Sequence, residues 1–241
     1  MLKGIYDAAS GMLPQIIRQN ATAHNLANVN TAGFKRELVI AEEQQRTEAE
    51  QTDWEVPQIT EIVIDFSQGA IEETGNKLHL AIEGDAFFAV ATPDGEMYTR
   101  AGNFTLSDAG KLITPDGFPV LAENGEIAVA GRELAVDQQG RISANGVSIG
   151  SLKLVTFAGV YPLERTGPGL YGIIEGGPSP SRAADFTVRQ GALEQSNVNV
   201  ISEMVDMIES YRHFETAQRM VQIQDQSLDK AINQLGMTGR G

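Results

Sequence analysis

The sequence contains no cysteine, which excludes disulfide bonds, thiolate chemistry and cysteine-ligated metal sites. Basic residues are also scarce, because 18 Lys and Arg stand against 32 Asp and Glu and leave a formal net charge of −14. An acidic chain is repelled by a phosphate backbone, so the composition argues against nucleic acid as a partner. The chain has 241 residues, enough for one sizeable hydrophobic core together with helical extensions.

Long apolar runs are absent as well. The sequence has no stretch of about 20 apolar residues to span a bilayer, so we expect no membrane insertion. The N-terminus lacks the unbroken apolar core of a secretory signal, since Asp7, Ser10 and Gln15 interrupt it. If the protein leaves the cytoplasm, we expect it to use a route that reads no cleaved signal peptide.

The residue types that usually carry catalysis form no recognisable arrangement. His24, His79 and His213 are the only histidines, and no two of them have the spacing of metal ligands. Aspartates beside glycines, such as Asp116, stand where Asp caps a turn through its own side chain. The glycines of 167–172 are not followed by the Lys-Ser/Thr of a phosphate-binding loop. We therefore expect no catalytic residue, no cofactor and no metal, and we interpret the chain as a non-enzymatic protein.

The C-terminal part of the chain carries the strongest pattern, an apolar residue at every seventh position. This first row consists of Val200, Met207, Phe214, Val221, Leu228 and Leu235. A second row of the same period contains Met204, Tyr211 and Ile232 and is interrupted by Gln218 and Asp225. A sustained repeat of seven predicts one long helix with a coiled-coil seam. Asn199 is suited to cap its N-terminus, and Gly236 is suited to end it.

The N-terminal segment also has helical spacing, from Leu2 to Ile17 and onward to about residue 28. Pro14 predicts either a kink or the start of a second helix, because an interior proline removes a helical hydrogen bond. Gly33 then allows the positive φ of a helix exit. Since chain termini usually lie close together, we expect the two terminal helices to pair as a coiled-coil-like stalk.

The middle of the chain has the period of two and the closely spaced turns that are typical of β-strands. The predicted fold class is α+β, with a mainly-β central domain and long N- and C-terminal helices. Residues 1–36 and 192–241 are expected to form one discontinuous helical assembly domain. Residues 37–58, which are acidic, are interpreted as a connector, and 59–191 as a β-rich outer domain.

Three stretches of the sequence resemble the axial proteins of the bacterial flagellum, the rod and hook family. Residues 23–36 are similar to the family signature Asn-Leu-Ala-Asn-x-x-Thr-x-Gly-Phe-Lys. Further similar stretches lie within 68–104 and 190–208, in the order of the family. The chain departs from the pattern at His79, where the family commonly has Asp, and at Ala86, where Gly usually precedes Phe-Phe.

The resemblance implies a structural subunit of the basal-body rod, the drive shaft in the periplasm, exported by the flagellar export apparatus without a cleaved signal peptide. It implies polymerisation through the terminal helices, with copies of itself and neighbouring rod subunits as partners. The length and residues 212–215 favour a proximal rod subunit, with a distal rod or hook-type subunit as the alternative. A secreted β-rich carbohydrate-binding protein or enzyme is a remote alternative. The only tryptophan of the sequence, Trp54, falls in the acidic connector, which counts against an aromatic platform for sugars.

The residues expected at the assembly interface come from both ends of the chain. They are Asn25, Leu26, Asn28, Gly33, Phe34, Val200, Met204, Met207, Tyr211, Phe214, Val221, Leu228 and Leu235. Asn25 and Asn28 lie three apart on one helix face, where they either fix the register of an interface or cap the helix end.

Overall fold

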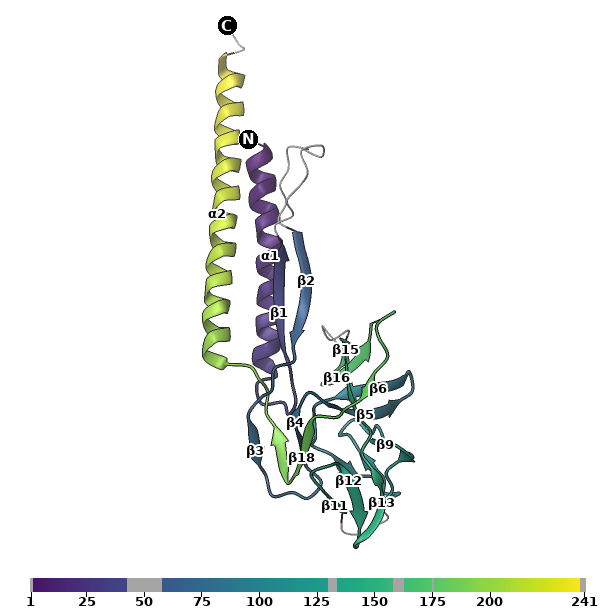
Figure 1. The fold of residues 1–241 in the computed structure, drawn as a ribbon. Helices are drawn as coiled ribbons and strands as arrows, with labels where there is room; N and C mark the ends of the chain where they lie inside the picture. Colours follow the sequence, from purple (N-terminus) through teal and green to yellow (C-terminus); the bar gives the residue numbers. More distant parts are fainter. Residues whose placement is uncertain (1, 43–57, 130–133, 158–162, 175, 239–241) are drawn as a thin grey trace. The chain divides into compact units, whose positions relative to one another are not determined.

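The computed structural model describes residues 2–42, 58–129, 134–157, 163–174 and 176–238 (Figure 1). The chain divides into two compact units. Unit 1 contains Met1–Ala27, Glu37–Asp65 and Asn199–Gly241, and unit 2 contains Asn28–Arg36 and Phe66–Val198. The fold is α+β, as the sequence predicts, because the central part is mostly β and each end is a helix.

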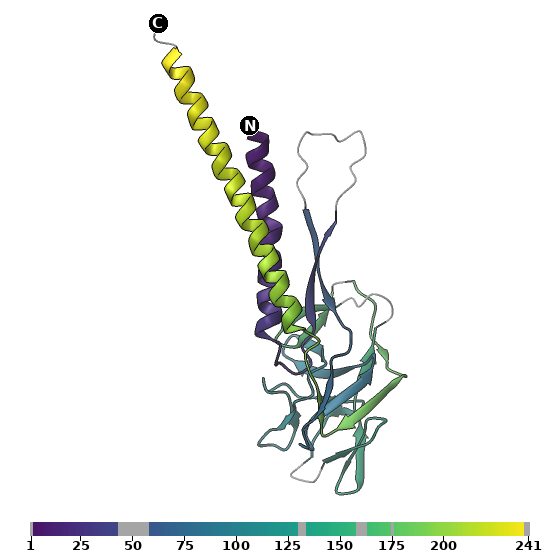
Figure 2. The ribbon, with the colours of Figure 1, turned by 90° about the vertical axis from the view of Figure 1, so that its left-hand side faces the viewer.

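Unit 1 is built around two helices, α1 (Leu2–Ala27) and α2 (Val200–Thr238), which lie side by side (Figures 1 and 2). α1 runs without interruption through Pro14, so the alternative of a second helix starting there is wrong. Asn199 caps α2, since its Oδ1 accepts hydrogen bonds from the N–H groups of Ile201 and Ser202 at 3.0 and 3.3 Å. The expected stop at Gly236 is not used, because α2 continues to Thr238.

Unit 1 also contains a two-stranded sheet of β1 (Arg36–Glu42) and β2 (Gln58–Asp65). Here the structure differs from the prediction of a connector at 37–58. The run Leu38-Val39-Ile40 has high β-propensity, which outweighs the acidic composition of the segment. The rest of the predicted connector, 43–57 with Trp54, lies outside the described residues.

Unit 2 contains a six-stranded sheet whose neighbouring strands are antiparallel. Its order is β15 (Leu163–Gly167), β16 (Leu170–Ile173), β6 (Gly95–Thr99), β5 (Phe87–Thr92), β14 (Leu154–Thr156) and β17 (Ser181–Arg182). A three-stranded sheet consists of β11 (Leu134–Val136), β12 (Arg141–Ala144) and β13 (Val147–Ser151).

Short strand pairs complete the described part of unit 2. They are β3 (Ile71–Glu73) with β19 (Ala192–Glu194), β4 (Leu80–Gly84) with β18 (Phe186–Gln190), β7 (Thr105–Leu106) with β8 (Leu112–Ile113), and β9 (Leu121–Ala122) with β10 (Gly125–Glu126). The pairs of β3 with β19 and of β4 with β18 join segments that are far apart in the sequence, so the C-terminal part of unit 2 completes sheets begun by its N-terminal part.

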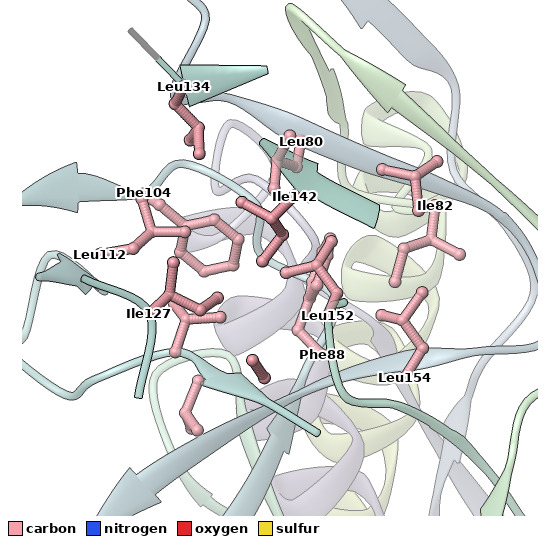
Figure 3. Close-up of a cluster of buried hydrophobic side chains, with 14 of the residues drawn as sticks. Leu80, Ile82, Phe88, Phe104, Leu112, Ile127, Leu134, Ile142, Leu152 and Leu154 are labelled. Atoms are coloured by element: carbon pink, nitrogen blue, oxygen red, sulfur yellow. The ribbon is translucent and has the colours of Figure 1, made fainter. Parts of the chain in front are cut away.

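The hydrophobic core of unit 2 gathers residues of these strands and of the segments between them (Figure 3). Leu80, Phe88 and Ile142 lie in it with at most 1% of their surface exposed. Phe88 meets Phe104 edge to face, with 5.0 Å between ring centroids. Burying such side chains contributes about 1.5–3 kcal/mol each, so this core holds unit 2 together.

Candidate functional site

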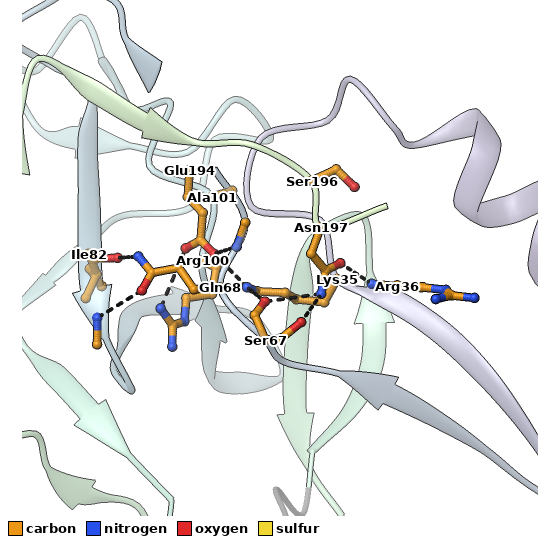
Figure 4. Close-up of polar contacts among 12 residues, drawn as sticks. Lys35, Arg36, Ser67, Gln68, Ile82, Arg100, Ala101, Glu194, Ser196 and Asn197 are labelled. Carbon is orange, nitrogen blue, oxygen red and sulfur yellow. Dashed lines mark hydrogen bonds and ion pairs between the residues drawn. The ribbon is translucent and has the colours of Figure 1, made fainter. Parts of the chain in front are cut away.

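Three charged side chains of unit 2 form a fully buried cluster, which we call the Glu194 cluster (Figure 4). Lys35 Nζ donates to Glu194 Oε1 at 2.6 Å, and Arg100 Nη1 lies 3.6 Å from Glu194 Oε2. The side chains of Lys35 and Glu194 are 0% exposed, and that of Arg100 is 1% exposed. Lys35 Nζ also donates to the carbonyl of Ser67 at 2.7 Å, and the Gly69 N–H donates to Glu194 Oε1 at 2.9 Å. Buried charges persist only when paired in this way.

Two arginines at or beside the cluster lie over aromatic rings. The guanidinium of Arg100 lies 4.7 Å from the ring centroid of Phe87, and that of Arg165 lies 4.3 Å from the ring centroid of Phe34. Arg165 Nη2 also donates to the carbonyl of Lys35 at 2.7 Å. A cation over an aromatic face is attracted by the ring, and the attraction grows when water is excluded. The Phe87 ring therefore offsets part of the cost of burying Arg100, one of the two cations beside Glu194.

The Glu194 cluster lies where two segments of unit 2 meet: 33–36, which follows α1 in the sequence, and 194–197, which precedes α2. The Gly33 N–H donates to the Glu194 carbonyl at 2.7 Å, and the Arg36 N–H donates to Asn197 Oδ1 at 2.8 Å. Gly33 has a φ of +66°, and a Cβ there would lie 2.3 Å from the Ala101 nitrogen. Residues 33–36 and 194–197 are thus held to each other by hydrogen bonds, and the close approach of Gly33 to the backbone of Ala101 requires a glycine.

Unit 1 has a polar contact of its own, centred on Asn25. Asn25 Oδ1 accepts from the Glu37 N–H at 2.8 Å, and Asn25 Nδ2 donates to the Glu37 carbonyl at 2.9 Å. Nδ2 also donates to Glu203 Oε2 on α2 at 3.2 Å. Asn25 and Glu203 are each 1% exposed, and His24 Nδ1 lies 3.1 Å from Glu37 Oε1. One amide thereby connects α1, α2 and the start of β1.

The two predicted rows of α2 differ in their burial. The members of the first row whose side chains are described are half-buried; these are Val200, Met207, Phe214, Val221 and Leu228. The side chain of Leu235 lies outside the described part of the structure. A third row of the same period, which is polar or small, lies next to the first row. Its members are buried or half-buried: Glu203, Ser210, Ala217 and Gln224. The described members of the second row are exposed instead, with Met204 at 49% and Tyr211 at 60%, and the side chain of Ile232 lies outside the described part of the structure.

Five large apolar side chains on the first turns of α2 face solvent in the subunit, and we call them the apolar patch. They are Ile201, Met204, Val205, Ile208 and Tyr211, exposed by 76%, 49%, 49%, 55% and 60%. At 3.6 residues per turn they share one helix face, which adjoins the first row on the side of Met204 and Tyr211. Contiguous exposed apolar side chains of this kind mark surfaces that another molecule covers.

The remaining predicted residues lie at the end of α1 and in the segment after it. Leu26 and Asn28 are half-buried, and Asn28 Oδ1 accepts from the Thr31 hydroxyl at 3.2 Å. Gly33 and Phe34 are buried in unit 2, Phe34 with 1% of its surface exposed. Whether these residues, Asn25 or the two rows contact other subunits stays a prediction.

Sequence reasoning missed the residues that complete both sites. Lys35 and Glu194 stand in stretches that carry the resemblance, but a charged residue usually lies on the surface, so nothing in the pattern marks them as buried. Among the described residues, no group of three or more His, Asp or Glu lies where it would hold a metal ion. Within the same residues, no helix is long and apolar enough to cross a membrane.

Comparison with known proteins matches three family models along the chain. The model described as flagellar basal body rod FlgEFG protein C-terminal matches residues 189–235. The flagellar hook protein FlgE/F/G D1 domain matches 81–144, and the flagella basal body rod protein model matches 5–35. The flagellar basal-body rod protein FlgF of Rhizobium meliloti (strain 1021) is 35% identical over 98% of this chain and 99% of its own. This chain belongs to the flagellar basal-body rod protein family.

Other rod proteins of the family are similar over nearly the same length. FlgG of Bacillus subtilis (strain 168) is 31% identical over 97% of this chain and 99% of its own. FlgF of Caulobacter vibrioides (strain ATCC 19089 / CIP 103742 / CB 15) is 33% identical over 89% of this chain and 90% of its own. The chain is therefore a structural subunit of the flagellar basal-body rod, and its family is not a class of enzymes.

Proposed function

We propose that this chain is a proximal rod subunit of the FlgF type. The alignment with FlgF of Rhizobium meliloti spans 241 residues, whereas that with FlgG of Bacillus subtilis spans 262 and requires gaps in this chain. The length thus supports FlgF, and the identity of 31% keeps the distal rod protein FlgG as the alternative. Complementation of strains that lack FlgF or FlgG separates the two, because a proximal subunit restores motility only in the first.

We further propose that the subunit works in the periplasm and reaches it through the flagellar export apparatus without cleavage of a signal peptide. The support is the family and the polar interruptions of the first residues of the sequence. Mass spectrometry of the protein from isolated basal bodies tests this proposal. A mature protein that begins well inside the chain would contradict it.

In our proposal the subunit polymerises through its terminal helices. Inside the subunit, α1 and α2 pair in a coiled-coil-like way along the first row, whose half-burial supports this. Toward neighbouring rod subunits, the contact is the apolar patch of α2. Rod proteins assemble with other rod subunits, and the patch presents five large apolar side chains that the subunit itself leaves 49–76% exposed. Full burial of such a side chain contributes roughly 1.5–3 kcal/mol, of which covering the part still exposed supplies about half to three quarters, and a polymer repeats this gain in every subunit.

The substitution Ile208→Asp tests this assignment. Ile208 is 55% exposed, so an aspartate there leaves the isolated subunit folded, while burying it against a neighbour requires desolvation of a charge. We expect loss of rod incorporation and of motility, with an unchanged circular dichroism spectrum and melting temperature. The matched control is His213→Asp, which places the same charge on an exposed position of α2 on another face of the helix and is expected to be tolerated.

Two outcomes would count against the proposal. Normal swimming of the Ile208→Asp strain would show that the patch is not the assembly surface. A lower melting temperature of the purified variant would show that this face belongs to the packing of the subunit itself.

A further inference from the structure

We propose that Asn25 is a positioning residue that fixes the register of α1 against α2 and against β1. This inference goes beyond the proposed function, because it concerns the internal geometry of the subunit and holds whatever covers the apolar patch. The consequence for assembly is that Asn25, by fixing the register of α2 against α1, also fixes the position of the apolar patch along α1.

The contact of Asn25 with β1 imitates a neighbouring strand. Its carboxamide oxygen accepts from the Glu37 N–H at 2.8 Å while its nitrogen donates to the Glu37 carbonyl at 2.9 Å. Paired residues of an antiparallel ladder exchange the same two bonds. The side chain thereby satisfies the open edge of β1 at one residue, and this two-bond geometry allows a single position of Glu37 relative to α1.

The second amide proton of Asn25 is directed to the other helix. Nδ2 donates to Glu203 Oε2 at 3.2 Å, across 178 residues of sequence. An asparagine side chain offers two donor hydrogens and one acceptor oxygen, and the three bonds to Glu37 and Glu203 use all of them. Asn25 and Glu203 are each 1% exposed. If the two helices slide and this bond breaks, water therefore cannot replace it.

The apolar contact of the helix pair does not define a register by itself. The first row repeats every seventh residue, so a slide of seven residues, about 10.5 Å at 1.5 Å per residue, brings another apolar residue to each position. The buried row beside it is not repetitive, since it has a carboxylate only at Glu203 and then Ser210, Ala217 and Gln224. A slide would place Ser210 where Glu203 lies and would take the buried carboxylate from its amide donor. A single buried polar residue in an apolar seam selects register in this way.

Asparagine is the residue that fits all three contacts. An alanine loses them, and an aspartate places a second carboxylate beside Glu203 and turns two donations into contacts between acceptors. The double variant Asn25→Asp with Glu203→Gln places the donor amide on α2 and the acceptor carboxylate on α1. It thereby restores an amide-to-carboxylate bond between α1 and α2.

The chain has no cysteine, so spin labels attach only to cysteines that are introduced, and the register can be tested directly in the full-length chain. Arg18→Cys on α1 and Arg212→Cys on α2, both exposed, carry spin labels whose separation is measured by pulsed electron paramagnetic resonance. We expect one narrow distance with Asn25 present. With Asn25→Ala we expect a second population at another distance, displaced by less than the roughly 10 Å of a full seven-residue slide because 33–36 and 194–197 stay held to each other. With Asn25→Asp the second population is larger, and adding Glu203→Gln reduces it.

The matched control is Asn20→Ala, the same substitution at an exposed position of α1, which is expected to leave the single distance unchanged. A distribution that is the same with Asn25→Ala as with Asn25, or equally altered by Asn20→Ala, would overturn the proposal. A broad distribution in the protein with Asn25 intact would overturn it too, because no register would then be fixed.

Discussion

Removing charges from the Glu194 cluster is expected to destabilise the protein in a definite order. Glu194 is the acceptor between two buried cations, 2.6 Å from Lys35 Nζ and 3.6 Å from Arg100 Nη1. Glu194→Gln removes the carboxylate that both buried cations face. Lys35→Met leaves Glu194 with Arg100 and with the Gly69 N–H at 2.9 Å. We therefore expect Glu194→Gln to cost more than Lys35→Met.

The magnitude follows from burial. Breaking a buried ion pair by removing one partner costs about 3–5 kcal/mol, and we place Lys35→Met near the lower end. At roughly 2–4 °C per kcal/mol for a chain of this size, its melting temperature falls by about 6–12 °C. The double variant Lys35→Met with Glu194→Gln neutralises both members of the closest pair. We therefore expect its loss of stability to be smaller than the sum of the two single losses by about 0.5–3 kcal/mol.

Urea unfolding followed by circular dichroism measures these differences. The matched control is Lys111→Met, which breaks the pair of Lys111 with Glu126, whose side chains are 42% and 41% exposed. An exposed pair contributes about 0–1 kcal/mol, so this variant is expected to remain close to the unmodified protein. If Lys35→Met costs no more than Lys111→Met, or if Glu194→Gln is the milder change, the argument from buried charge is refuted.

Two further substitutions test the backbone contact and the response to alkali. Gly33→Ala is expected to cost more than about 1 kcal/mol, since Gly33 has a φ of +66° and its Cβ would meet the Ala101 nitrogen at 2.3 Å. Gly75→Ala, at a φ of +72° with nothing within 4 Å, should cost less, and equal costs in urea unfolding would contradict the clash. Burial, the charge of Glu96 and a hydrogen bond to it raise the pKa of Tyr98 from 10.0 to about 12. The unfolded chain therefore loses this proton first, and stability falls as pH rises from about 10 to about 12. Relative to its effect below pH 10, Tyr98→Phe should recover up to about 2–3 kcal/mol near pH 12.

The long helices were predictable because their signals are local and periodic. The repeat of seven from Val200 onward predicts α2, and Asn199 has the side chain that its N-terminus needs. The position of the helix ends was less predictable, since Gly236 is tolerated inside α2. A glycine in a helix costs about 1 kcal/mol, which neighbouring turns can offset.

The buried polar contacts were not predictable from one sequence. Lys35 and Glu194 are 159 residues apart, and only the folded strands of unit 2 bring them together. β1 was hidden for a related reason, because Asn25 provides bonds to its edge from a different element. The row that accompanies the first row of α2 was also missed, since Glu203 and Ser210 are polar and hydrophobic periodicity does not register them.

The arrangement of polar and apolar residues on α2 supports a division of tasks between its two faces. Apolar burial is strong but not directional, so it supplies affinity without defining how far two helices slide. A buried hydrogen bond contributes little net stability, yet it penalises every arrangement in which it is broken. In our proposals Glu203, on the face toward α1, fixes the register of the subunit through Asn25, while Ile208 and its neighbours are kept for contact with other subunits. A subunit built in this way presents the same surface to each neighbour, because the geometry of the patch is decided before the patch is covered.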